Sequence, residues 1–110
     1  MEDGLSPLDG VNMRGVFGEQ GQLNVIRLDP GSVVPNHDHP HEQLGMILEG
    51  EQILIVEGVE HRLGPLDAYV LPGGVEHGGR GGPEGCLSID IFVPCREDYR
   101  PAEATPVNDL

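Results

Sequence analysis

Glycine and proline interrupt this chain at short intervals, and this punctuation leaves little room for long helices. The 110 residues include 17 glycines and 10 prolines. Both residues break regular structure, and short apolar segments bounded by turn residues are typical of β-strands. No segment has the periodicity of an amphipathic helix. The sequence therefore predicts an all-β fold.

Six segments have the composition and the bounds of strands. The first ends at Asp29-Pro30-Gly31, a sequence that favours a turn. The second and third flank Glu49-Gly50 and are predicted to form a hairpin. The last follows a glycine-rich connection from Gly78 to Gly85. The predicted strands are Gln22 to Leu28, Gln43 to Leu48, Gln52 to Glu57, Val59 to Leu63, Ala68 to Leu71 and Cys86 to Val93.

The length of the chain allows one domain. Short strands at regular spacing indicate a sandwich or a small barrel, and closure into a barrel removes exposed sheet edges. We expect the barrel to span residues 14–100. Residues 1–13 are expected to be an N-terminal tail or peripheral segment, and residues 101–110 a C-terminal tail.

The charge and the apolar pattern of the chain limit which partners and which location we expect. A formal net charge of -13 with six Lys and Arg residues argues against nucleic-acid binding. No apolar run reaches membrane-spanning length, and the first residues lack the pattern of a signal peptide. We therefore expect a cytoplasmic protein without a membrane partner, in which Cys86 and Cys95 stay reduced.

Two predicted strands are apolar on both faces. Met46-Ile47-Leu48 and the segment from Ile53 to Val56 do not alternate with polar residues, whereas a strand with one wet face should. If one face fills the barrel, the other needs a cover. We therefore expect a homodimer or a larger oligomer.

The histidines suggest one metal site. His37 and His39 are two residues apart, so in an extended segment both side chains point to the same side. Gln43 lies an even number of positions further on, and His77 would arrive from another strand. Such ligands suit one divalent transition metal ion, Zn, Ni, Fe or Mn, without choosing among them. We expect His41 and His61 to be ordinary surface or turn residues.

These positions resemble the two sequence motifs of the cupin family. The resemblance implies a double-stranded β-helix, or jelly-roll barrel, with the metal inside. It rests on Gly31, His37, His39, Gln43 and Gly50 for the first motif and on Pro72, Gly74 and His77 for the second. Two positions depart from the family pattern: Leu66 stands in place of a glycine and Gly81 in place of Asn. The family usually has Glu where this chain has Gln43. The neutral amide leaves the charge of the metal uncompensated, which favours an anionic ligand and Lewis-acid chemistry.

The last predicted strand carries a carboxylate among apolar residues. Period-two alternation puts Cys86, Ser88, Asp90 and Phe92 on one face. Two readings of Asp90 stay open from this pattern. The face is exposed to solvent and Asp90 has no function, or the face lies inside the barrel and Asp90 belongs to a site.

A closer resemblance joins this strand to the metal motif. The chain resembles small cupins of the KdgF type, which convert 4,5-unsaturated uronates from pectin or alginate breakdown into linear keto-uronates. The residues that carry this resemblance are Gln43, Asp90, Phe92 and Arg96. It implies that Asp90 transfers protons, that Arg96 holds the substrate carboxylate, and that Phe92 forms a wall of the pocket. The resemblance also implies that the substrate is a small anionic molecule, a sugar acid.

Other activities remain compatible with the sequence, because one fold supports many functions. The alternatives are another metal-dependent isomerase, cyclase, lyase or dioxygenase of a small oxygenated acid, and a non-catalytic cupin that binds a sugar acid. A nucleophilic cysteine is disfavoured, because neither Cys86 nor Cys95 has a histidine or basic partner nearby in sequence.

Overall fold

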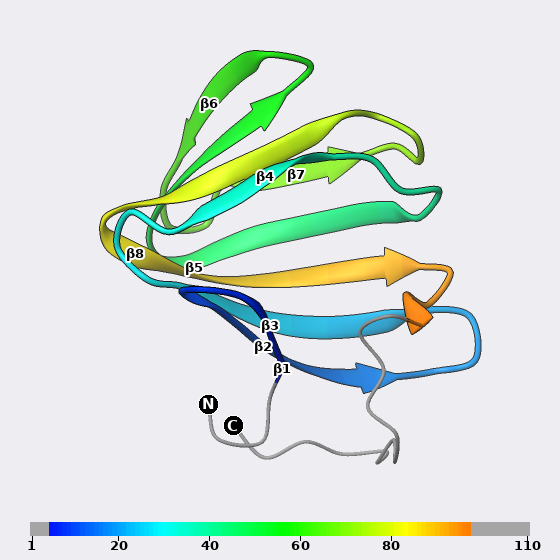
Figure 1. Cartoon of the computed structure of the whole chain (residues 1–110). Helices are drawn as coiled ribbons and strands as arrows, with labels where there is room; N and C mark the ends of the chain where they lie inside the picture. Colours follow the sequence, from blue (N-terminus) through cyan, green and yellow to red (C-terminus); the bar gives the residue numbers. More distant parts are fainter. Residues whose placement is uncertain (1–4, 98–110) are drawn as a thin grey trace.

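Eight β-strands make up the fold (Figure 1), which a computed structural model describes for residues 5–97. Over these residues no helix is long and apolar enough to cross a membrane. The strands are β1 Leu5–Leu8, β2 Val11–Phe17, β3 Gln22–Leu28, β4 Val33–His37, β5 Glu42–Val56, β6 Val59–Leu63, β7 Ala68–Leu71 and β8 His77–Val93.

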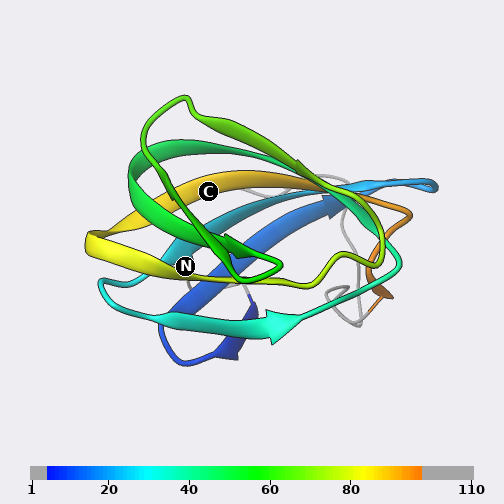
Figure 2. The ribbon, with the colours of Figure 1, turned by 90° about the horizontal axis from the view of Figure 1, so that it is seen from above.

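The two long strands, β5 and β8, organise the sheet. They pair with each other antiparallel along most of their length, and each changes neighbours halfway. The first half of β5 pairs with β7 and its second half with β6. The first half of β8 pairs with β4 and its second half with β3. The result is a sheet that rolls into a jelly-roll barrel, as the view from above shows (Figure 2).

The predicted hairpin at Glu49-Gly50 is wrong, because β5 runs straight through both residues. The pairing of β5 with β8 shifts register on either side of Glu49 and Gly50. Gly50 has a φ of 78°, and a Cβ at this position would collide with the Gly85 carbonyl. The positive φ therefore makes a bulge that bends the strand where the sheet rolls over, and does not reverse the chain.

The prediction that Gly78 to Gly85 form a connection between strands is also wrong, because these residues belong to the first half of β8. At Gly78 an added Cβ would lie 2.8 Å from the Val34 carbonyl oxygen of β4. At Gly79 it would lie 3.1 Å from the Ile53 carbonyl oxygen of β5. The first contact is closer than a Cβ allows and the second is tight, so glycine lets the neighbouring strands approach at this end of the barrel.

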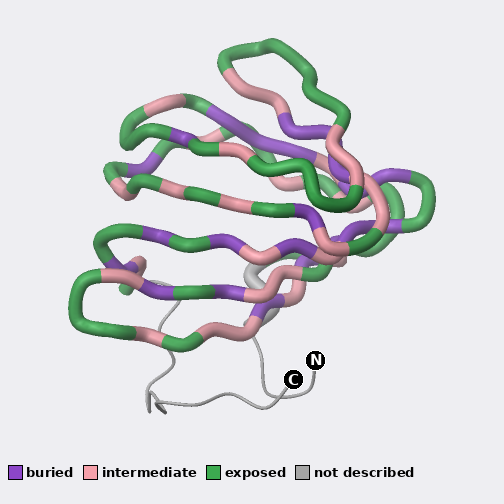
Figure 3. The backbone as a smooth tube through the Cα atoms, turned by 180° about the vertical axis from the view of Figure 1, so that it is seen from behind, coloured by how far each residue is buried: buried purple, intermediate pink, exposed green. Residues whose placement is uncertain are grey.

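The sheet begins before the expected barrel boundary at residue 14. Strand β1 and the start of β2 lie within residues 5–13, and Val11 and Met13 are each only 3% exposed. Val11 packs in the core cluster with Leu28, Ile47 and Cys86. Buried positions alternate with less buried ones along part of β3 and the second half of β8 (Figure 3), so one face of the rolled sheet forms the interior there. The predicted tail at residues 101–110 lies outside the described residues.

Candidate metal centre

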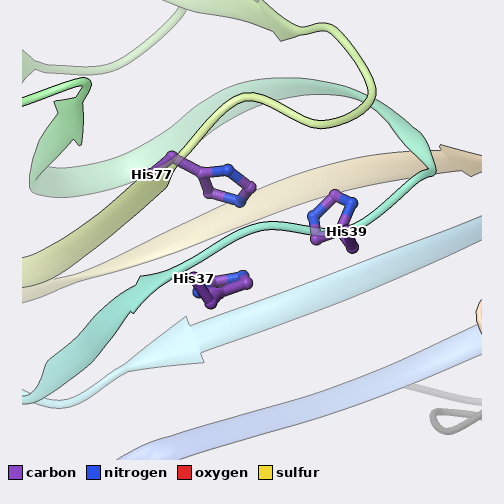
Figure 4. A group of neighbouring side chains, drawn as sticks. All are labelled: His37, His39 and His77. Atoms are coloured by element: carbon purple, nitrogen blue, oxygen red, sulfur yellow. The ribbon is translucent and has the colours of Figure 1, made fainter.

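Three imidazole rings converge from different parts of the chain (Figure 4). His37 ends β4, His39 lies in the following loop, and His77 begins β8. His37 and His77 are register partners, and their ring centroids lie 4.4 Å apart. The His39 ring lies 4.8 Å from that of His77 and 5.5 Å from that of His37. One ring nitrogen of each residue falls within 4.8 Å of the others, a spacing that can hold one metal ion.

Backbone carbonyls set the same tautomer in all three rings. Each Nδ1 lies within hydrogen-bond distance of a carbonyl oxygen two residues away, so Nδ1 carries the proton and donates it. The pairs are His37 with Pro35 at 2.8 Å, His39 with His41 at 3.0 Å and His77 with Val75 at 3.0 Å. Each Nε2 is then left with a free lone pair, as a metal ligand requires.

Burial favours the neutral form of two of these rings. It lowers the pKa of His39, and the nearby Arg96 charge lowers that pKa further. Burial also lowers the pKa of His77, although the hydrogen bond to Val75 opposes the effect. A neutral imidazole is the form that binds a metal ion.

Gln43 lies beside the rings in an arrangement that fits a shared cation. Its Oε1 is 3.2 Å from Nε2 of His39. Because Nδ1 of His39 donates to His41, the facing Nε2 has a lone pair, and so does Oε1. Two lone-pair atoms this close repel each other unless a cation lies near both. The donor set of three imidazoles and an amide oxygen therefore fits a divalent transition metal.

Asp90 lies behind Gln43, inside the barrel. It is 1% exposed, and its Oδ1 accepts a hydrogen bond of 3.1 Å from Nε2 of Gln43. The Tyr69 hydroxyl also donates to Oδ1, and Ser88 Oγ donates to Oδ2 at 3.1 Å. Burial raises the pKa of the Asp90 carboxyl, and these three hydrogen bonds oppose the rise. The reading of Asp90 as an exposed residue is therefore excluded.

A cavity of about 450 Å³ joins the metal group to the last strand. Asp90, Phe92 and Arg96 line it together with His37, Gln43 and His77. Phe92 is buried, and its ring lies 5.9 Å from that of His39. The Arg96 guanidinium carbon lies 5.5 Å from the centroid of the Phe92 ring, within cation–π range. The residues predicted from two distant sequence motifs thus surround one cavity.

The sequence assigned no role to several polar residues that support this group. Tyr69 and Ser88 bond to Asp90, and Gln22 accepts a hydrogen bond from the Arg96 backbone N–H. Gln22 also donates to Asn24 at 2.7 Å, and both are buried. Period-two alternation in β3 and β7 could have placed these side chains inside the barrel, but only with the inward face already known.

Two other histidines and two arginines lie outside this site. His41 and His61 are outside the three-histidine group. Arg62 approaches Glu51 at 3.7 Å, and Arg80 pairs with Glu60 at 3.2 Å, both away from the cavity. Cys86 and Cys95 are free and buried.

Comparison with known proteins assigns the family. Residues 24–85 match the family model described as the cupin domain. The chain therefore belongs to the cupin family, in agreement with its jelly-roll fold and its metal-type histidine group.

Two solved structures are similar over most of the chain. KdgF from Halomonas sp. is 30% identical, with a TM-score of 0.81 over 87% of this chain and 89% of that chain. An RmlC-like cupin from Shewanella frigidimarina is 31% identical, with a TM-score of 0.80 over 89% of this chain and 90% of that chain.

A curated relative is similar over a shorter segment. The dimethylsulfoniopropionate lyase DddW of Ruegeria pomeroyi is 35% identical over 63 residues, which are 57% of this chain and 41% of that protein. The chain thus spans less than half the length of this relative.

Proposed function

We propose that this cupin is a metal-dependent enzyme that converts 4,5-unsaturated uronates into linear keto-uronates. One observation carries the proposal: Asp90, Phe92 and Arg96 line the same cavity as His37 and His77, two members of the histidine group. Their place matches the role that the resemblance to KdgF-type cupins implies. The similarity to Halomonas KdgF over most of both chains supports the same assignment.

The metal ion would be held by His37, His39, His77 and Gln43, and it would polarise substrate oxygens as a Lewis acid. Zn, Ni, Fe and Mn all suit these ligands. With neutral imidazole rings, these four side chains supply no negative charge to balance the charge of the metal ion. The site therefore favours an anionic molecule despite the net charge of -13 on the whole chain.

Asp90 would move the protons of the reaction. The conversion is an isomerisation in which the C1 hydroxyl loses a proton, the ring C1–O bond breaks and C4 gains a proton. Burial raises the pKa of Asp90, which suits a group that both accepts and donates a proton. The Tyr69 hydroxyl, bonded to the same carboxyl oxygen, holds the Asp90 side chain in place.

Arg96 and Phe92 would bind and orient the sugar acid. The guanidinium can hold a carboxylate through two parallel hydrogen bonds, a geometry that lysine does not reproduce. Gln22 accepts from the backbone N–H of Arg96 and so fixes the segment that carries this side chain. The buried Phe92 ring, next to His39, offers an apolar surface to one face of the sugar.

An absorbance assay tests the proposal. Wild-type protein loaded with metal should accelerate the loss of ultraviolet absorbance of an unsaturated uronate from pectin or alginate, and chelation should remove the effect. Asp90→Asn should slow the reaction by about 10²–10⁴-fold, the usual contribution of a general acid or base. His61→Ala, on β6 and outside the histidine group, is the matched control. No acceleration over buffer with either type of uronate would refute the proposal.

A lyase acting on a small carboxylate is the second candidate. The similarity to dimethylsulfoniopropionate lyase DddW favours it, and the matched segment covers just over half of this chain. Assaying dimethylsulfoniopropionate alongside the uronates separates the two activities. A non-catalytic sugar-acid-binding cupin would instead show thermal stabilisation by the uronate without turnover, and a dioxygenase would consume oxygen.

We further propose that the enzyme is a homodimer, formed through the outer face of the sheet. Leu23, Leu44, Met46 and Ile91 point outward from the strands at 38–42% exposure. The pairing of Leu44 and Leu23 with Ile91 joins three of them in one row across β5, β8 and β3. Such a contiguous apolar surface is typical of a face that a partner covers.

Charges beside this row favour a second copy of the chain as the partner. Arg27 on β3 and Glu49 on β5 flank Leu87 of β8, and both are exposed. A two-fold axis parallel to β8 would bring Arg27 of one copy opposite Glu49 of the other, and this contact would form twice. The apolar row would then face the same row of the second copy.

We also propose that the enzyme is cytoplasmic, since free buried thiols are typical of a reducing compartment.

A further inference from the structure

The orientation of the Gln43 amide is set by its neighbour on β8. An amide side chain has an oxygen at one side and an NH₂ group at the other, and only the oxygen can bind a cation. In Gln43 the NH₂ group donates to Asp90 Oδ1 at 3.1 Å. Its oxygen is therefore turned toward Nε2 of His39, at 3.2 Å.

Asp90 is itself held in position from two strands. Tyr69 on β7 donates to Oδ1, the same oxygen that accepts from Gln43. Ser88, two residues before Asp90 on β8, donates to Oδ2 at 3.1 Å. With both oxygens bonded and 1% of the residue exposed, the carboxyl group has little freedom to turn.

Gly45 makes the contact between Tyr69 and Asp90 possible. It is the register partner of both residues, and so lies between them on β5. A Cβ at Gly45 would collide with the Tyr69 ring and with Asp90 Oδ1. Glycine is unfavourable in a strand interior, and here it opens the path along which the phenol reaches the carboxyl group.

We propose that Asp90, held by Tyr69 and Ser88, is a positioning residue that presents the Gln43 amide oxygen to the metal. Without an acceptor at this position, the Gln43 amide can rotate and turn its NH₂ group toward the cation. Partners of this kind behind a ligand contribute about 10–100-fold to metal affinity. The inference rests on the proposed metal site, but it needs no uronate reaction.

Two substitutions at Asp90 separate positioning from proton transfer. Asp90→Asn keeps an oxygen that can accept from Gln43, but it cannot act as an acid or base. Asp90→Leu keeps a similar volume and offers no acceptor at all. The probe is Co²⁺ alone. Titrating it into the metal-free full chain gives the binding affinity, and the visible absorption of bound Co²⁺ reports the number and type of ligands.

We expect Asp90→Leu to bind Co²⁺ about 10–100-fold more weakly, with an altered spectrum. Asp90→Asn should stay within a few-fold of wild type with an unchanged spectrum, even though it loses turnover. Tyr69→Phe should also bind Co²⁺ more weakly than wild type, but with a smaller loss of affinity than Asp90→Leu. Circular dichroism of each metal-free variant confirms that it is folded.

A double substitution provides the decisive control. Gln43→Glu replaces the amide with a carboxylate, which has an oxygen at either side and needs no orientation. In this background Asp90→Leu should not weaken Co²⁺ binding, because the carboxylate at position 43 has no donor for Asp90 and is repelled by it. Equal Co²⁺ affinity of Asp90→Leu and wild type would overturn the proposal. An equal loss of Co²⁺ affinity on Asp90→Leu in the wild-type and Gln43→Glu backgrounds would overturn it as well. Failure of uronate turnover with intact Co²⁺ results would refute only the proposed reaction.

Discussion

His37 and His77 are Cα partners across β4 and β8, and their rings lie 4.4 Å apart. Two candidate ligands that lie far apart in the sequence are therefore brought together by strand pairing. His39, in the loop after β4, completes the group from the same side. A metal bound here joins β4, β8 and the connecting loop, so metal binding and stability of the fold should be coupled.

Removing one of these ligands tests that coupling. His77→Ala should weaken Zn²⁺ binding by more than about 100-fold, since even the loss of a partner behind a ligand costs about 10–100-fold. In wild type, Zn²⁺ at about 100 times its Kd should stabilise the fold by about 2.7 kcal/mol. Calorimetric titration and thermal unfolding with and without chelator measure both effects.

The matched control for this experiment is His61→Ala, which removes a histidine of β6 outside the group. It should keep wild-type Zn²⁺ affinity and the full stabilisation by the metal. Equal Zn²⁺ affinities for His77→Ala and His61→Ala would contradict the assignment of the site.

Arg96 is predicted to act on substrate binding. Arg96→Lys keeps the charge but loses the paired hydrogen-bond geometry. Loss of one hydrogen bond to a charged group costs about 1.5–3 kcal/mol, so KM for the uronate should rise by about 10–100-fold with a smaller change in kcat. Arg62→Lys, at an arginine outside the cavity, should leave both constants unchanged. A fall in kcat at constant KM would show that Arg96 does not hold the carboxylate.

Cys86 is predicted to be chemically inert in the folded protein. It is buried, and burial raises the pKa of its thiol to about 11, with Asp90 adding to the rise. The thiolate is the reactive form, so iodoacetamide at pH 8 should modify Cys86 only after unfolding. Mass spectrometry of digested native and denatured samples identifies the modified residue. Rapid modification of Cys86 in the native state would revive the nucleophilic alternative.

The outer apolar row is predicted to hold the dimer together. Ile91→Glu places a charge at the middle of this row, where it pairs with Leu44 and Leu23 of the neighbouring strands. Sedimentation at micromolar concentration should show a dimer for wild type and a monomer for Ile91→Glu. Val59→Glu, at an exposed apolar residue of β6 outside the row, should remain dimeric. A monomeric wild type would rule out this interface.

The sequence predicted the parts of the fold that depend on local chemistry. Strand β3 has the predicted bounds because a Pro-Gly turn follows it directly, and β6 and β7 likewise match. The positive φ of Gly50 is compatible with a turn or a bulge, and only pairing with β8 decides between them. Gly78 is likewise compatible with a loop or a strand, and only its pairing with β4, which its lack of a side chain allows, decides between them.

The candidate site was predictable to a similar extent. The spacing of His37 and His39 is encoded locally, and the second motif contained His77, which strand pairing brings to them. The contacts of Asp90 with Tyr69 and Gln43 were not predictable, because they depend on which faces of β5, β7 and β8 form the interior. Alternation put Asp90 on the same face as Phe92, but did not say whether that face was inside.

The decisive measurement is the rate at which purified, metal-loaded protein removes the ultraviolet absorbance of an unsaturated uronate. We expect acceleration over buffer that is lost on chelation, restored by added metal, and reduced about 10²–10⁴-fold in Asp90→Asn. A wild-type rate equal to buffer, for uronates from both pectin and alginate, would contradict it.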